Sequence, residues 1–282
     1  MNSAESGPNV ALGREGTLGF LAGILIGAAA GMIGVGGGEF RIPVLIYVLR
    51  LPVRVAAGAN TVIGLAVVVL GALRRWNQHR WSADDFTLAG VMIVASLVGA
   101  ALGARWANRL PLRPLKIFVI AYLFVVGAWM IVEALLHAEH TLLNPTGIGR
   151  WILAAATAFL IAGMSGALGV AGGEMRIPAL IYLFGLPLKP AGTVSLLVSI
   201  PTVAAAALTY RRLGHIPNSV LAVAAVMGVG SLVGVLIGAA LLPYVDKHAL
   251  KGILGAVLLA ATACLLLPWI GERRTSATAA KT

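Results

Sequence analysis

Gly31-Met-Ile-Gly-Val-Gly-Gly-Gly-Glu-Phe-Arg-Ile-Pro-Val-Leu-Ile-Tyr47 is a stretch that the chain repeats as Gly166-Ala-Leu-Gly-Val-Ala-Gly-Gly-Glu-Met-Arg-Ile-Pro-Ala-Leu-Ile-Tyr182. Twelve of the 17 positions are identical, at a constant offset of 135 residues. Each copy places glycines, a Glu, an Arg and a Pro within apolar sequence. Glycine and proline interruptions at matching places in two hydrophobic halves indicate a binding site between two membrane repeats.

The composition excludes a soluble globular domain. Of the 282 residues, 59% are hydrophobic and 11% are charged, whereas a soluble domain has about 25% charged residues. Apolar runs of about 18 residues recur along the chain, and each is long enough to cross the hydrocarbon core. We therefore predict an all-α polytopic membrane protein whose surroundings are the lipid bilayer. The net charge of +11 comes from basic residues between apolar segments, where they anchor to headgroups, so no nucleic-acid partner is expected.

The sequence predicts no chemistry that depends on a disulfide, a metal ion or a nucleotide. Cys264 is the only cysteine, no carboxylate or histidine cluster has metal-ligand spacing, and no Gly-Lys-Ser/Thr sequence follows the glycines. The sequence thus predicts no metal, no cofactor and no ATP hydrolysis, and the protein is not expected to be an enzyme. A homodimer is possible.

The duplication divides the chain into two repeats of five segments each. We expect a polar N-terminal tail over 1–16, membrane repeat 1 over 17–136, a connection over 137–150, membrane repeat 2 over 151–270 and a basic C-terminal tail over 271–282. The expected segments are 17–33, 40–50, 56–73, 85–104 and 114–136, then 151–168, 175–185, 192–209, 219–242 and 250–270. The second segment of each repeat is much shorter than the others.

The relative orientation of the repeats depends on whether the short segments cross the membrane. Five crossings per repeat make the halves inverted, and four make them parallel. With five crossings and a cytoplasmic N-terminus, more basic residues fall on the cytoplasmic side, which favours inverted repeats. Both termini are then expected in the cytoplasm of an inner-membrane protein. On this assignment Arg74 and Arg75 lie in a connection on the other side.

Small residues recur at every fourth position in the first segment of each repeat. They are Gly19, Gly23, Gly27 and Gly31, and then Ala154, Ala158, Ala162 and Gly166. The fourth segments have the same spacing in Gly99-x-x-x-Gly103 and Gly234-x-x-x-Gly238. Such stripes predict close packing of helix backbones.

The glycine cluster of each motif predicts a break in the first helix. Gly34-x-Gly36-Gly37-Gly38 cannot sustain a stable helix, because each Gly costs roughly 1 kcal/mol relative to Ala. We expect breaks at 34–38 and 169–173, with the freed backbone groups buried in protein or lining a cavity. Pro43 and Pro178 are expected in the first turn of the short helices that follow, whose N-terminal N–H groups attract anions.

The charged residues of the motif predict an anion site. A charge at the bilayer centre costs at least about 2.5 kcal/mol, and a guanidinium group suits oxyanions. We therefore predict that Arg41 and Arg176 bind an anion, while Glu39 and Glu174 orient the Arg side chains or carry a coupling proton. The other predicted members are motif glycines and small polar residues of the next segments, namely Gly36, Gly37, Gly38, Gly172, Gly173, Asn60, Thr61 and Ser195.

Two alternatives assign these charges no role in binding. Buried ion pairs, Glu39 with Arg176 and Glu174 with Arg41, are one way to hold the repeats together, since residues two apart on a helix do not face each other. The other alternative places the four charges at the membrane interface, because the segments that carry them are short.

The duplicated motif resembles the TauE/SafE family of membrane transporters, also called the sulfite exporter or sulfonate permease family. The family pattern is Gly-x-Gly-Gly-Gly with Pro a few residues later; 34–43 matches it fully and 169–178 matches it with Ala171 in place of the middle Gly. The resemblance spans 17–270 and implies proton-coupled transport of sulfite, sulfoacetate, thiosulfate or another sulfur-containing or organic anion. The Glu-x-Arg insert is not common to the whole family.

We accordingly expect a secondary transporter of a small anion, with alternating access around a site between the two glycine breaks. A passive anion channel is the nearest alternative, and a membrane scaffold that transports nothing is a more distant one. Saturable, gradient-driven accumulation separates the carrier from the channel.

Overall fold

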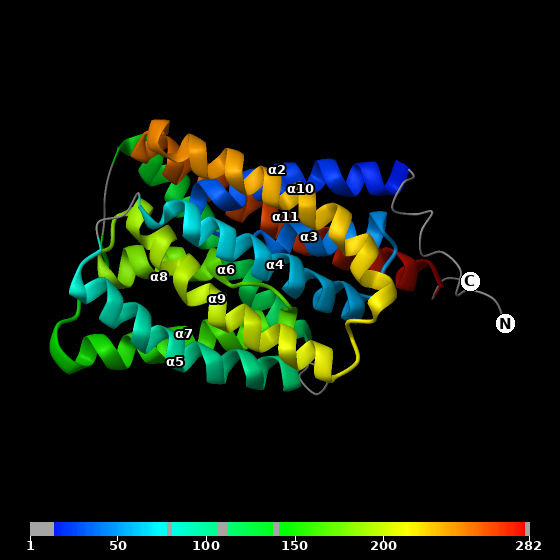
Figure 1. Ribbon diagram of the computed structural model, residues 1–282, viewed down its shortest axis with the longest axis horizontal. Helices are drawn as coiled ribbons and strands as arrows, with labels where there is room; N and C mark the ends of the chain where they lie inside the picture. The colour runs from blue at the N-terminus through cyan, green and yellow to red at the C-terminus, as the bar shows by residue number, and fades with distance from the viewer. Residues whose placement is uncertain (1–13, 78–80, 107–111, 138–140, 280–282) are drawn as a thin grey trace. The chain divides into compact units, whose positions relative to one another are not determined.

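The computed structural model describes the chain apart from residues 1–13, 78–80, 107–111, 138–140 and 280–282 (Figure 1). Its described residues form helices without any strand. The helices of the first half are α2 (Arg14–Ile33), α3 (Gly38–Pro43), the π-helix η1 (Val44–Val48), α4 (Val53–Trp76), α5 (Ala83–Trp106) and α6 (Leu112–Leu136). Those of the second half are α7 (Gly147–Leu168), α8 (Gly173–Phe184), α9 (Leu188–Arg212), α10 (Asn218–Leu241), the 3-10 helix η2 (Leu242–Tyr244) and α11 (Lys247–Ala279).

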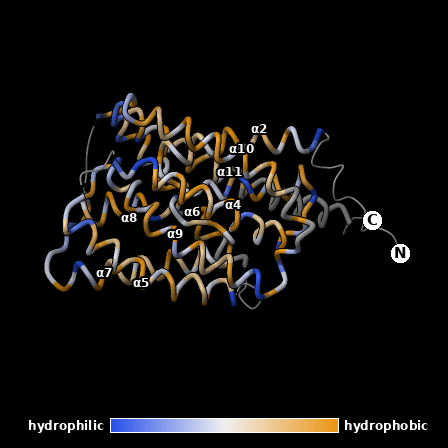
Figure 2. Tube along the Cα trace, in the orientation of Figure 1, coloured by the Kyte–Doolittle hydropathy of each residue, from blue (hydrophilic) through white to orange (hydrophobic). Residues whose placement is uncertain are grey.

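The all-α membrane fold is confirmed. Eight helices in the described chain are long and apolar enough to cross a membrane, and the short helices α3 and α8 occupy the second place in each half. Hydrophobic residues run along the helices, and hydrophilic residues gather near their ends (Figure 2). The protein is therefore a multi-pass membrane protein.

The chain divides into two compact units that cut across the sequence repeats. Unit 1 comprises residues 1–110 and 140–247, and unit 2 comprises 111–139 and 248–282. Each repeat thus contributes its last long helix, α6 or α11, to unit 2, and the remaining helices to unit 1.

Within unit 1 the helices pack in an order that is symmetric with respect to the repeats. Helix α2 packs on α10, α10 on α4, α4 on α9, α9 on α5 and α5 on α7. The pairs α2–α10 and α5–α7 lie at the two ends of this order (Figure 1). The first helix of each repeat therefore packs against the fourth helix of the other repeat.

The equivalent helices α4 and α9 run antiparallel. A Cβ atom built on Gly71 would lie 3.4 Å from Cδ1 of Leu196, and one built on Gly64 would lie 3.9 Å from Cγ1 of Val203. Residue numbers thus rise along one helix as they fall along the other. Inverted repeats require their equivalent helices to run antiparallel, as α4 and α9 do. The inverted orientation of the whole repeats stays a prediction.

The small-residue stripes form the contacts between α2 and α10 and between α5 and α7. A Cβ on Gly27 would lie 2.1 Å from the carbonyl oxygen of Ser231, and one on Gly103 would lie 2.0 Å from that of Gly163. Neither position has room for a larger side chain without movement of a backbone. The close packing predicted from the spacing is confirmed.

Unit 2 is a pair of antiparallel helices joined by a buried ion pair. Lys251 Nζ on α11 lies 2.5 Å from Glu133 Oε2 on α6. The backbones also approach closely, since a Cβ on Gly127 would lie 3.1 Å from the carbonyl oxygen of Gly255. Both charges are buried, which makes the pair a polar anchor in an apolar interface.

Candidate anion site at the glycine breaks

The first helix of each repeat ends where the glycine cluster predicts. Helix α2 ends at Ile33 and α7 ends at Leu168. Gly37 and Gly172 precede the short helices with φ of 66° and 73°, a left-handed conformation that glycine adopts without steric cost.

The prolines do not start the short helices, so that prediction is wrong. Helices α3 and α8 begin at Gly38 and Gly173, which places Pro43 and Pro178 at the sixth residue of each. After Pro43 the backbone continues as the π-helix η1, whereas after the equivalent Pro178 the α-helix α8 continues to Phe184.

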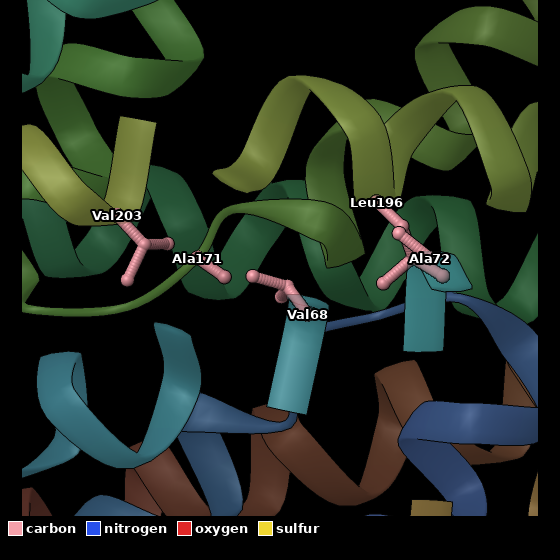
Figure 3. Packing of buried hydrophobic residues seen from close by; sticks show 5 residues of the cluster. All are labelled: Val68, Ala72, Ala171, Leu196 and Val203. Atoms are coloured by element: carbon pink, nitrogen blue, oxygen red, sulfur yellow. The ribbon is translucent and has the colours of Figure 1, made fainter. Parts of the chain in front are cut away.

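The two glycine breaks meet inside unit 1. A Cβ on Gly36 would lie only 2.2 Å from the Cβ of Ala171, and one on Gly173 would lie 3.0 Å from Cα of Val35. Ala171 also joins a buried cluster with Val68, Ala72, Leu196 and Val203. Figure 3 shows Ala171 among these side chains of α4 and α9. The breaks are therefore packed by protein on both sides.

Arg41 is a fully buried side chain with a free donor. Its Nε donates to Asn60 Oδ1 at 2.9 Å, and its Nη2 donates to the carbonyl oxygen of Gly36 at 2.5 Å. Asn60 in turn donates to the carbonyl oxygen of Gly169 at 2.7 Å, in the break of the other repeat. The Nη1 atom is buried and has no hydrogen-bond partner in the described part of the chain.

Arg176 has the equivalent place in the second repeat, with different partners. Its Nη1 donates to Ser199 Oγ at 2.7 Å and to the carbonyl oxygen of Ser195 at 3.3 Å. Nε, Nη2 and the hydroxyl of Ser195 are buried without partners among the described residues. Each guanidinium group thus makes two hydrogen bonds and has further N–H groups without an acceptor among the described residues.

The two carboxyl groups of the motif interact across the repeats. Glu39 is close enough to Glu174 for the two carboxyl groups to interact electrostatically, and Glu174 Oε1 accepts the N–H of Gly37 at 3.2 Å. Glu174 is also near enough to act electrostatically on both Arg41 and Arg176. Each carboxyl group keeps one buried oxygen, Oε2, without a donor in the residues that the structure covers.

Both non-binding alternatives disagree with this arrangement. Glu39 is 6% exposed and the other three charges are 0% exposed, so they do not lie at an interface with water or headgroups. The ion pairs within 4.0 Å among the described residues do not join these carboxylates to these guanidinium groups.

The remaining predicted residues pack against, or form hydrogen bonds with, other groups of the protein. Gly38 makes room for Asn60, because a Cβ there would lie 2.7 Å from the Asn60 amide nitrogen, while Gly172 packs against Ser165. The hydroxyl of Thr61 donates to the carbonyl oxygen of Gly58, in its own helix, at 2.6 Å. The N–H of Gly37 donates to Glu174, so it is engaged by the protein itself.

Ser199, a hydrogen-bond partner of Arg176, is not among the predicted site residues, and the burial of Arg75 is not predicted. Ser199 lies one helical turn after Ser195, so its position on the same face of α9 was available from the sequence. Arg75 was assigned to a connection, whereas the structure buries it completely in the last turn of α4.

Comparison with known proteins gives one family and several relatives. The family model described as sulfite exporter TauE/SafE matches residues 19–265. A probable membrane transporter protein of Xylella fastidiosa (strain 9a5c) is 38% identical over 86 residues, which are 30% of this chain and 32% of that protein. The probable membrane transporter protein YjnA of Bacillus subtilis (strain 168) is 25% identical over 251 residues, 85% of this chain and 95% of that protein.

A third relative shares a shorter part. The probable membrane transporter protein MamO of Magnetospirillum gryphiswaldense is 31% identical over 113 residues, 38% of this chain and 18% of that protein. The chain spans about a third of the length of the Xylella proteins that it matches. No solved structure matches the chain.

Proposed function

Since the chain belongs to the TauE/SafE family of membrane transporters, we propose that it is a secondary transporter of a small anion such as sulfite, a sulfonate or thiosulfate. The single observation that carries this proposal is the pair Arg41 and Arg176. Both are fully buried, and both keep unpartnered N–H groups without an ion pair in the described chain. A buried N–H donor that lacks an acceptor is costly, and an anion that reaches the two groups offsets that cost.

The site supports oxyanions in particular. Guanidinium N–H groups form short, charge-assisted hydrogen bonds with sulfur oxyanions and carboxylates. Asn60 and Ser199 orient the two guanidinium groups, and the hydroxyl of Ser195 is a further donor. The transported species is therefore a small anion with several oxygen atoms.

Glu39 and Glu174 are the proposed proton carriers. The two carboxyl groups are buried and interact with each other, and two adjacent negative charges repel, so the pair is a place where a proton can be carried. Glu174 also acts on both guanidinium groups, so the charge of the carboxyl pair affects how strongly an anion is held. Proton release and anion binding are thereby coupled in one place.

Alternating access is proposed to move one repeat relative to the other around the meeting point of the glycine breaks. The contact between Gly36 and Ala171 lies at this point, and Asn60 crosses it to bind the carbonyl of Gly169. We place the protein in the inner membrane with both termini in the cytoplasm.

The test of the anion site is transport into proteoliposomes. Radiolabelled sulfite, thiosulfate and sulfoacetate are offered under a pH gradient of each polarity, with wild type, Arg41→Gln and Arg176→Gln. We expect accumulation in wild type and its loss in both variants, each of which removes a cation at the anion. Arg54→Gln is the matched control, because Arg54 is an exposed arginine of α4. Uptake that only equilibrates would indicate a channel, and variants that accumulate like wild type would remove the site.

The test of proton coupling is Glu174→Gln. Glutamine keeps an oxygen that can accept the N–H of Gly37 but cannot release a proton. We expect loss of pH-driven accumulation, with exchange of labelled for unlabelled anion at equal pH retained. An unchanged response to the pH gradient contradicts the role of Glu174, and loss of exchange as well indicates a damaged site.

A further inference from the structure

Arg75 is a third fully buried arginine, away from the Glu-x-Arg motif. It lies in the last turn of α4, and its exposed fraction is 0%. Its Nη2 donates to the carbonyl oxygen of Lys189, at the start of α9, at 2.9 Å. Nε and Nη1 are buried without hydrogen-bond partners in the described chain, where no carboxylate pairs with Arg75 either.

Two glycines, one from each repeat, make room for this guanidinium group. A Cβ on Gly34 would lie 2.5 Å from Nη1 of Arg75, and a Cβ on Gly192 would lie 2.9 Å from the same atom. Gly34 begins the glycine break whose Gly36 carbonyl binds Arg41. Arg75 and Arg41 therefore contact two parts of the same break.

The equivalent place in the second half is built differently. Tyr210 is the counterpart of Arg75 at the offset of 135, and its hydroxyl donates to the carbonyl oxygens of Gly166 and Ala167 at 3.3 Å each. The counterpart of Gly192 is Ala57, which packs against Gly169. An uncharged side chain thus suffices to support the broken helix there, so the charge of Arg75 is not needed for that support.

We propose that Arg75 binds the transported anion at a second site, on the side of unit 1 at which α4 ends and α9 begins. This inference rests on the proposed function, because its ligand is the same small oxyanion. The anion binds the free Nε–H and Nη1–H groups there, beside the glycine break whose Gly36 carbonyl binds Arg41. The second half holds Tyr210 in place of a cation, so the additional site belongs to one side of the protein.

The experiment measures binding of radiolabelled sulfite to the full-length protein in detergent by equilibrium dialysis. Wild type is expected to bind two sulfite ions per chain, and Arg75→Gln one. Arg74→Gln is the matched control, because Arg74 is the exposed neighbour on the same helix, and this variant is expected to bind two. Arg41→Gln in the same assay tests the site formed by Arg41 and Arg176.

The outcomes separate this inference from the proposed function. If Arg41→Gln reduces sulfite binding and Arg75→Gln does not, the second site is overturned and the proposed function stands. Wild-type protein that binds no sulfite overturns both for this anion. Should glutamine at 75 unfold the protein, Arg75→Lys keeps the charge with fewer donors; about a tenfold weaker second binding step supports the site, and two unchanged steps contradict it.

Discussion

Gly36 and Ala171 occupy equivalent positions of the two repeats, and their contact explains why the second motif departs from the glycine pattern. The separation of 2.2 Å for a Cβ on Gly36 is far below the roughly 3.5–4.0 Å at which carbon atoms attract each other. One methyl group fits between the breaks, and two do not. Ala171 is therefore compatible with the fold because Gly36 faces it.

The substitution Gly36→Ala is expected to destabilise the protein by about 1–3 kcal/mol through overpacking. The double variant Gly36→Ala/Ala171→Gly moves the methyl group to the other side of the contact, so it is expected to recover most of that loss. Apparent melting temperatures in detergent measure both effects, with Ala171→Gly alone as the control. Additive losses in the double variant would show that the two positions do not share one space.

At the residue scale, the sequence predicts the motif charges better than the residues around them. Arg41 and Arg176 lie in long apolar stretches, so their burial follows from position. Arg75 follows Arg74 near the end of an apolar run, which is typical of a headgroup anchor. Its buried neighbours Val68 and Ala72 lie seven and three residues before it. Helical periodicity therefore places Arg75 on the buried face of α4, and this signal was not used in the prediction.

At the element scale, the contact between α2 and α10 depends on glycines whose replacement by alanine would force the two helices apart. Gly27→Ala brings a Cβ to 2.1 Å from the Ser231 carbonyl oxygen, so the backbones must separate. We expect this substitution to lower the free energy of unfolding by about 1–3 kcal/mol. Gly90→Ala, in α5, is the matched control: a Cβ there meets no atom within 4 Å, and alanine favours a helix by up to about 1 kcal/mol.

Apparent melting temperatures should therefore fall for Gly27→Ala and stay or rise for Gly90→Ala. Equal shifts for the two variants would indicate that the contact between α2 and α10 contributes little to stability.

The helices themselves are predictable because long apolar runs must satisfy their backbone groups internally in a membrane. The observed ends differ by a few residues, as for α4, which runs from Val53 to Trp76 where 56–73 is expected. The short segments were harder to predict. Their start is set by the left-handed glycines at 37 and 172, while Pro43 coincides with a change to π-helix that apolar periodicity does not encode.

At the scale of the whole molecule, the duplication is visible in the sequence but the pairing of helices is not. Small-residue stripes predict that helices pack closely, yet they do not say which stripe meets which. The structure pairs the first helix of one repeat with the fourth of the other, and it places α6 and α11 in a unit of their own. These choices depend on surfaces far apart in the chain, which no local pattern specifies.

The inverted relation of the repeats can be tested by labelling equivalent helix ends from one side of the membrane. Asn77 and Arg212, exposed residues just after α4 and at the end of α9, are equivalent at the offset of 135. In a Cys264→Ser background, which removes the only cysteine, Asn77→Cys and Arg212→Cys are each treated in intact cells with a membrane-impermeant maleimide. Because α4 and α9 run antiparallel, we expect one cysteine to react before lysis and the other only after it. Labelling of both from the same side would show that the repeats are parallel and would remove the symmetry on which the alternating-access proposal depends.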